Sequence, residues 1–120
     1  MPDSPAAAAE SYVAASLEER GWQVLARNLR TCWGEVDLLT VDPDAVLVVV
    51  EVKARHPLSW ARGEEALRPR QRRRLARALE GVAMQRGWRG PLRVDLAEVD
   101  LLGDRPADWR LLRGVDLCGE

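Results

Sequence analysis

Three residues of this sequence combine two carboxylates and one amine at a spacing that can do chemistry. Asp37 lies in the segment Gly-Glu-Val-Asp-Leu-Leu-Thr-Val (34–41), and Glu51 and Lys53 lie in the segment Val-Leu-Val-Val-Val-Glu-Val-Lys-Ala-Arg (46–55). Two carboxylates held close together repel each other unless a cation lies between them, and Mg2+ is usually held by one or two carboxylates plus substrate phosphates. An ammonium group beside such an ion can stabilise phosphate charge or position an attacking water. The trio therefore indicates metal-assisted phosphodiester chemistry, with an ordinary ion pair on a solvated strand as the alternative.

The two segments must pair as neighbouring strands for the acids to meet. Residues 42–45 read Asp-Pro-Asp-Ala, which is typical of a tight turn, so we predict an antiparallel hairpin. If Asp42 lies opposite Val46, then Asp37 lies opposite Glu51 and their Cβ atoms are about 4.5–5.5 Å apart. If the register slips by one residue, the two acids point to opposite faces. Whether Asp37 and Glu51 can bind one metal ion therefore depends on the register that the turn sets.

Lys53 shares a strand face with Glu51, because side chains alternate along a strand. The chain has 18 basic residues, and Lys53 is its only lysine. A lysine amine is a compact, strongly hydrated charge, unlike the planar guanidinium of arginine. The apolar run 46–50 that leads into Glu51 predicts a strand covered on both faces, so charges at its end need partners or a function.

The whole chain reads as one α/β domain of 120 residues, with a core at about 5–102 and a last strand and tail at 103–120. Its net charge of −1 means that any nucleic-acid surface is a local patch. We expect a cytoplasmic protein without a membrane partner, because no apolar run has the length of a membrane span and the N-terminus lacks a leader pattern. Cys32 and Cys118 are too few and too far apart for a zinc cluster, and the oligomeric state stays open.

Two helices should flank the hairpin. Ser4 as N-cap before Pro5, with Gly21 as the stop, bounds the first, and Pro69 and Gly87 bound the second. We predict further strands at 22–26, 92–102 and 109–113, with residues 27–30 turning out of the first of these and a turn at 104–106. A helix between the strand that ends at Lys53 and strand 92–102 allows those two strands to run parallel.

Two polar side chains fall on the inward faces of the predicted helices. Glu10 continues the apolar stripe of Val13 and Leu17, and it either reaches the metal site as a further acid or is solvated at the margin of the stripe. Gln71 ends the stripe of the second helix, where its amide contacts a metal-bound water, a phosphate or a backbone group.

A basic patch marks the second helix. Six arginines lie within residues 68–77 and indicate contact with a phosphate backbone, without base-specific readout; the alternative is a solvated face paired with Glu64, Glu65 and Glu80. Trp33 either stacks on a base or covers the hairpin, a flap is expected over Trp60 to Gly63, and Asp95 is expected to pair with Arg93. The candidate phosphate contacts are Arg27, Arg30, Arg55, Arg68, Arg70, Arg73, Arg74 and Arg77.

The order and spacing of these motifs resemble the YraN family of small bacterial proteins, within the PD-(D/E)xK nuclease-like superfamily. The likeness runs from about Ser11 to Val99 and includes segments 21–22, 27–30 and 63–75. It implies a restriction-endonuclease-like αβββαβ core with a mixed central sheet, similar to archaeal Holliday junction resolvases.

The same resemblance implies a DNA endonuclease that uses Mg2+ or Mn2+ and no small-molecule cofactor. Asp37, Glu51, the Val52 carbonyl and Glu10 would hold the metal, Lys53 would be the catalytic amine, and Gln71 would support them. Branched or damaged DNA is the substrate that the resolvase analogy indicates. The alternatives are a catalytically inactive nucleic-acid-binding module of the same fold, or an interaction protein whose charges are structural.

Overall fold

Five strands form one mixed sheet in chain order, β1-β2-β3-β4-β5. The computed structural model describes residues 4–56 and 68–114. Strands β3 and β4 run parallel, and the other neighbouring pairs run antiparallel. The elements are α1 (Pro5–Glu19), β1 (Gln23–Thr31), β2 (Gly34–Val41), β3 (Leu47–Arg55), α2 (Pro69–Arg86), β4 (Leu92–Leu102) and β5 (Arg105–Leu112).

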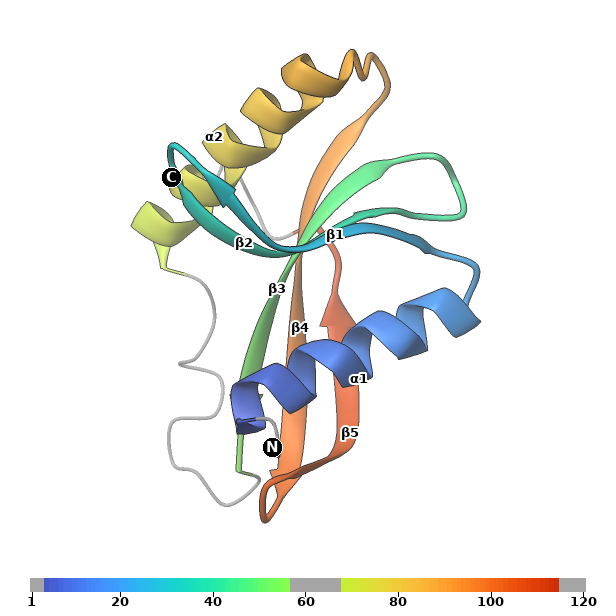
Figure 1. Cartoon of the computed structure of the whole chain (residues 1–120), viewed down its shortest axis with the longest axis vertical. Helices are drawn as coiled ribbons and strands as arrows, with labels where there is room; N and C mark the ends of the chain where they lie inside the picture. The colour runs from blue at the N-terminus through green and yellow to red at the C-terminus, as the bar shows by residue number, and fades with distance from the viewer. Residues whose placement is uncertain (1–3, 57–67, 115–120) are drawn as a thin grey trace.

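The two helices pack on opposite faces of the sheet, so the core has two layers (Figure 1). One layer joins α1 to Leu38, Val48 and Val50, and the other joins α2 to Leu39 and Val49. The apolar run of β3 is therefore buried on both faces, as its composition predicts. The charged residues Glu51, Lys53 and Arg55 follow this buried run, and Glu51 and Arg55 are themselves buried.

Both helices begin and end at the predicted residues. The hydroxyl of Ser4 accepts a 3.1 Å hydrogen bond from the N–H of Ala7, and Pro5 occupies the first turn. Gly87 ends α2 in the left-handed conformation (φ 68°). Strand β4 coincides with the predicted 92–102 segment. In the described parts of the chain, no helix is long and apolar enough to cross a membrane.

The predicted turn at 27–30 is wrong, because strand β1 continues through these residues. It runs on to Thr31 because residues 27–31 pair with the first residues of β2. A register shift between Val24 and Ala26, together with the left-handed backbone of Asn28 (φ 51°), accompanies the strand instead of ending it. Strand β5 also begins earlier than predicted, at Arg105, after a turn that uses Gly103 at φ 63°. The predicted flap at 60–63, and Glu64 and Glu65, lie outside the described residues.

Candidate active site

The turn between β2 and β3 gives the register that brings the acids together. The N–H of Asp42 donates to the carbonyl of Val46 at 3.0 Å, and the carboxylate of Asp42 accepts from the N–H groups of Asp44 (2.8 Å) and Val46 (3.0 Å). Strand pairing then runs from Val41 opposite Leu47 to Leu38 opposite Val50. Asp37 and Glu51 are the next residues in that register, so the predicted hairpin is confirmed.

Asp37 lies where the paired ladder between β2 and β3 ends. Its Oδ2 accepts a 2.8 Å hydrogen bond from the backbone N–H of Val52. The side chain therefore replaces a backbone partner and fixes the carboxylate beside the strand that carries Glu51 and Lys53.

Glu51 is buried, and its two carboxylate oxygens differ in their contacts. Oε2 accepts a 3.1 Å hydrogen bond from the Gln71 amide of α2, whereas no N–H or hydroxyl group of the described residues donates to the buried Oε1. Burial raises the pKa of Glu51 to about 7. The charge of Asp37 and a hydrogen bond between the two carboxyl groups add to this effect, against the opposing charges of Lys53 and Arg74. Two carboxyl groups in contact, one of which is costly to ionise, suit a cation.

Glu10 reaches this group from α1. Burial raises the pKa of Glu10, followed by the charge of Asp37 and a hydrogen bond between the two carboxyl groups, while Asn28 and Arg27 act in the opposite sense. Four elements thus contribute to one site: α1, β2, β3 and α2. Glu10, Asp37, Glu51 and Gln71, which were selected from sequence, are brought together.

The acids fit a hydrated metal ion better than a closed protein cage. Among the described residues, no group of three or more His, Cys, Asp or Glu side chains is arranged to hold a metal by itself. The pair of Asp37 and Glu51 is a donor set typical for Mg2+, which keeps several waters and takes substrate oxygens. Lys53 is half-buried on the same face of β3 as Glu51.

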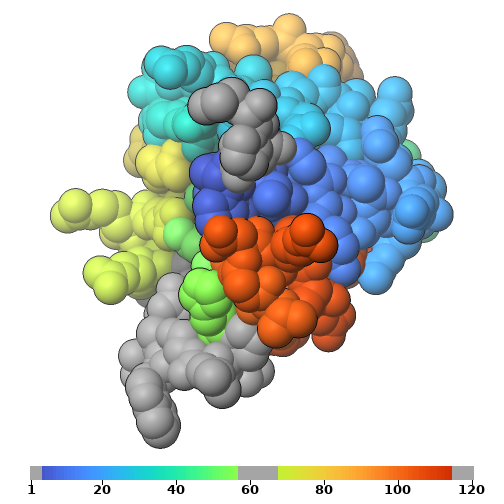
Figure 2. All heavy atoms as spheres, turned by 60° about the horizontal axis from the view of Figure 1, so that its bottom comes forward, coloured from blue at the N-terminus to red at the C-terminus, as the bar shows by residue number. Residues whose placement is uncertain are grey.

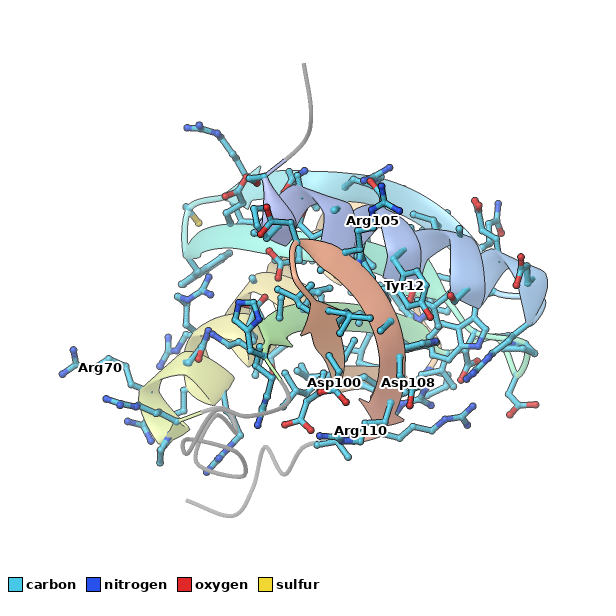
Figure 3. All side chains as sticks on the ribbon, turned by 90° about the horizontal axis from the view of Figure 1, so that it is seen from below. Tyr12, Arg70, Asp100, Arg105, Asp108 and Arg110 are labelled. Atoms are coloured by element: carbon cyan, nitrogen blue, oxygen red, sulfur yellow. The ribbon has the colours of Figure 1, made fainter. Side chains whose placement is uncertain are left out.

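Arg55 lies in a different environment from the one expected. Its side chain is only 4% exposed and pairs with Glu98 of β4 at 2.6 Å, so its position does not favour the expected phosphate contact. Glu98 also accepts from Arg110 at 2.8 Å. Figure 3 shows Arg110 beside Asp100 and Asp108 on β4 and β5. Sequence reasoning missed Glu98, although the parallel register places it beside Lys53.

The α2 arginines divide into exposed and anchored side chains. Arg74 donates to the carbonyls of Trp33 (3.3 Å) and Glu35 (3.1 Å) and is therefore held by the β1–β2 hairpin. Figure 3 shows Arg70 pointing away from the body of the protein, and Figure 2 shows the start of α2, in yellow-green, projecting from it. The exposed candidates on this helix and at its N-cap are Arg68, Arg70, Arg73 and Arg77.

Arg27 and Arg93 have structural partners of their own, whereas Arg30 of β1 is exposed. Arg27 donates to the Ser11 hydroxyl at 2.7 Å. Arg93 donates to both carboxylate oxygens of Asp95, at 2.8 and 3.0 Å, as predicted. Hydrogen bonding to Asp95 raises the pKa of Arg93. The pairing of Arg93 with Asp95 lies within β4 and does not involve Asp37 or Glu51.

Comparisons with known proteins identify relatives over most of the chain. A family model described as "Uncharacterised protein family UPF0102" matches residues 9–101. A UPF0102 protein of Bifidobacterium longum (strain NCC 2705) is 35% identical over 108 residues, covering 88% of this chain and 87% of that protein. A relative from Granulibacter bethesdensis is 45% identical over 97 residues (79% and 60% covered), and one from Acidiphilium cryptum is 47% identical over 98 residues (80% and 73% covered).

A solved structure shares the fold. It is described as the structure of an EndoMS–dsDNA2 complex, and it aligns with a TM-score of 0.50 and 21% identity over 78% of this chain. This chain spans about a third of that protein, 36% of its length. The mixed sheet with its two helices is therefore a restriction-endonuclease-like fold, as the sequence resemblance implies.

Proposed function

The chain belongs to the UPF0102 family, and we propose that it is a metal-dependent endonuclease that hydrolyses phosphodiester bonds in DNA. One observation carries the proposal: Glu51 is buried against the carboxyl group of Asp37, which helps to raise its pKa, and no N–H or hydroxyl group of the described residues donates to its buried Oε1. A purely structural carboxylate would be expected to have both oxygens satisfied. Fold likeness alone would not assign an activity.

The residues of the candidate site have different roles in the proposed reaction. Gln71 holds one oxygen of Glu51, and the Val52 N–H holds one oxygen of Asp37, so both carboxylates are preorganised. Asp37 and Glu51, with the Val52 carbonyl, would hold Mg2+ or Mn2+, which would supply Lewis-acid stabilisation of phosphate charge; Glu10 contacts Asp37 and does not complete a set of three acids that could hold a metal among the described residues. Lys53 lies on the same strand face as Glu51 and donates to a phosphate oxygen or to the attacking water.

DNA as the substrate rests on charge and on fold likeness. Exposed arginines at the start of α2 provide a basic surface on a chain of net charge −1, and such surfaces bind phosphate backbones without reading sequence. The similar fold of EndoMS was determined with dsDNA. By analogy with resolvases, branched or damaged DNA is the preferred form.

A catalytically inactive nucleic-acid-binding module is the second candidate. It is favoured by one observation, namely that the described residues contain no group of three metal-binding side chains. Such a module would use the same arginines and would bind DNA without cleaving it.

The test is cleavage of duplex, single-stranded, flapped and four-way-junction DNA with Mg2+ and with Mn2+. The parent should cleave at least one substrate, and Asp37→Asn and Lys53→Gln should abolish cleavage. Asp108→Asn is the matched control, because Asp108 is an exposed acid of β5. Salt-sensitive binding without cleavage by the parent would favour the second candidate. A parent that neither binds nor cleaves DNA would overturn both.

A further inference from the structure

A hollow lies between the tip of the β1–β2 hairpin and α2, separate from the acids. Figure 1 shows the hairpin tip beside α2, and the hollow has a volume of about 340 Å3. Ligand pockets typically have volumes of about 300–1,000 Å3, so this one suits a single small group and not a duplex. Its walls come from residues 29–33 of the hairpin and from α2, where Gly81, Gln85 and Arg86 face it.

Trp33 forms one wall of this hairpin pocket and is held in place by a glycine of α2. A Cβ at Gly81 would lie only 2.4 Å from the Trp33 ring, so the absence of a side chain at Gly81 lets the ring lie against the helix. Trp33 nevertheless remains 39% exposed. The pocket therefore offers a fixed aromatic surface that is open to solvent.

The polar walls of the pocket are basic. Arg30 of β1 and Arg86 of α2 are exposed, and none of the residues around the pocket is acidic, although the chain contains 19 acids. The exposed Gln85 adds an amide that can donate and accept hydrogen bonds. The Thr31 hydroxyl makes two hydrogen bonds within the hairpin: it donates to the Gly34 carbonyl at 2.6 Å and accepts from the Trp33 N–H at 3.1 Å. We therefore do not assign it a contact with the ligand.

We propose that the hairpin pocket binds one unpaired nucleotide of a DNA strand. The base stacks on Trp33, and Arg30 and Arg86 contact the flanking phosphates, which is the combination that proteins use for single-stranded nucleic acids. A stacked base in a duplex has both faces covered and cannot enter. The inference rests on the proposed function and narrows its substrate to DNA that carries unpaired nucleotides.

One side chain joins the pocket to the active site. Arg74 donates to the carbonyls on either side of the hairpin tip, at Trp33 and Glu35, and its charge opposes the rise in the pKa of Glu51. The side chain that anchors the hairpin tip is therefore also one whose charge acts on Glu51. A DNA strand whose unpaired base lies against Trp33 therefore also lies near α2, the helix that carries Arg74 and Gln71.

The test uses metal-free protein in EDTA, so that binding is measured without cleavage. Single-stranded oligonucleotides with one 2-aminopurine should lose fluorescence when the base stacks on Trp33, whereas a duplex of the same sequence should not. Trp33→Leu should abolish the quenching and weaken single-strand binding about 5- to 100-fold. Arg30→Gln and Arg86→Gln, which change exposed side chains, should each reduce the salt dependence of single-strand binding by about 0.7 in log–log slope.

Arg105→Gln, at an exposed arginine of β5, is the matched control and should change neither quantity. Thermal melting of each variant separates lost binding from lost folding, and the two arginine variants carry the test if Trp33→Leu melts early. If the parent binds or cleaves DNA but shows no quenching, and the three variants bind single strands as the parent does, the pocket inference is wrong and the proposed function stands. A parent protein without affinity for any DNA would contradict both the pocket inference and the proposed function.

Discussion

The backbone N–H of Val52 donates a 2.8 Å hydrogen bond to the carboxylate of Asp37, at the point where β2 and β3 stop pairing. The acid that would bind a metal also holds two strands together. Its structural and chemical tasks can be separated because asparagine keeps the accepting oxygen and removes the charge. Alanine removes both.

We expect Asp37→Asn and Asp37→Ala to be equally inactive but unequally stable. Alanine leaves the Val52 N–H without its partner, which should lower the free energy of unfolding by about 1–3 kcal/mol. The free energy of unfolding of Asp37→Asn should lie within about 1 kcal/mol of the parent value. Urea unfolding in EDTA measures the difference, and equal stability of the two variants would contradict the role given to this hydrogen bond.

Glu51→Gln should stabilise the metal-free protein at neutral and alkaline pH. The folded pKa of about 7 exceeds the ordinary value of 4.5, so ionising Glu51 costs the folded state free energy that is absent below about pH 4.5, grows between the two values and is constant above the higher one. The gain from the substitution should follow that course and reach at most about 3 kcal/mol. Melting curves of both proteins at pH 5 and pH 8 check this, and a gain of equal size at both pH values would refute it.

Divalent metal should bind with proton release near neutral pH. Glu51 must lose its proton to become a ligand, so affinity for Mn2+ should rise as the pH increases towards about 7 and then level off. Calorimetry in two buffers with different ionisation enthalpies measures the proton release directly. Glu51→Gln should bind Mn2+ weakly and without this pH dependence.

Lys53→Arg should test why a chain rich in arginine has a lysine here. The substitution keeps the positive charge but replaces a compact amine with a planar fork. We expect cleavage to fall by about 100-fold or more, as for the loss of a positioned transition-state donor. DNA affinity should stay within about threefold of the parent, and parental cleavage by Lys53→Arg would exclude a specific role for the amine.

Two glycines should prove necessary for docking the hairpin on α2. A Cβ at Gly34 would lie 2.6 Å from Nη1 of Arg74, and one at Gly81 would collide with Trp33. Gly34 also has a left-handed backbone (φ 113°), as does Gly103 (φ 63°), where a Cβ would meet nothing within 4 Å.

Alanine at Gly103 is therefore the control for backbone strain. Gly81→Ala should lower the free energy of unfolding by about 1–3 kcal/mol through overpacking against the Trp33 ring. Gly34→Ala should lower it by about 1–3 kcal/mol through backbone strain at φ 113° and displacement of the Arg74 guanidinium, and Gly103→Ala by about 1 kcal/mol or less. Increased fluorescence quenching of Trp33 by acrylamide in Gly81→Ala would report the displaced ring. Parental stability and quenching in Gly81→Ala would show that the hairpin docks differently.

The parts of the site that were predicted correctly are those fixed by local chemistry. The Asp42-Pro43 turn set the register that pairs β2 with β3, and the alternation of β3 placed Glu51 and Lys53 on one face. Proline at the start of α2 and glycine at its end marked the helix that carries Gln71.

The errors arose where distant segments decide the structure. The turn expected at 27–30 is overridden by pairing with β2, and Arg55 is buried because Glu98 lies on the neighbouring parallel strand. The anchoring of Arg74 depends on where the hairpin tip lies. None of these contacts leaves a periodic pattern in the sequence.

The chain order of the sheet has a kinetic consequence. Asp37, Glu51 and Lys53 all lie in β1–β2–β3, where each strand pairs with its sequence neighbour, whereas β3 meets β4 only after a crossover from Arg55 to Leu92. Short-range pairings close at lower entropic cost than long-range ones. We therefore expect the acids to assemble early in folding, and the arginine helix to dock onto an acid pair that is already formed.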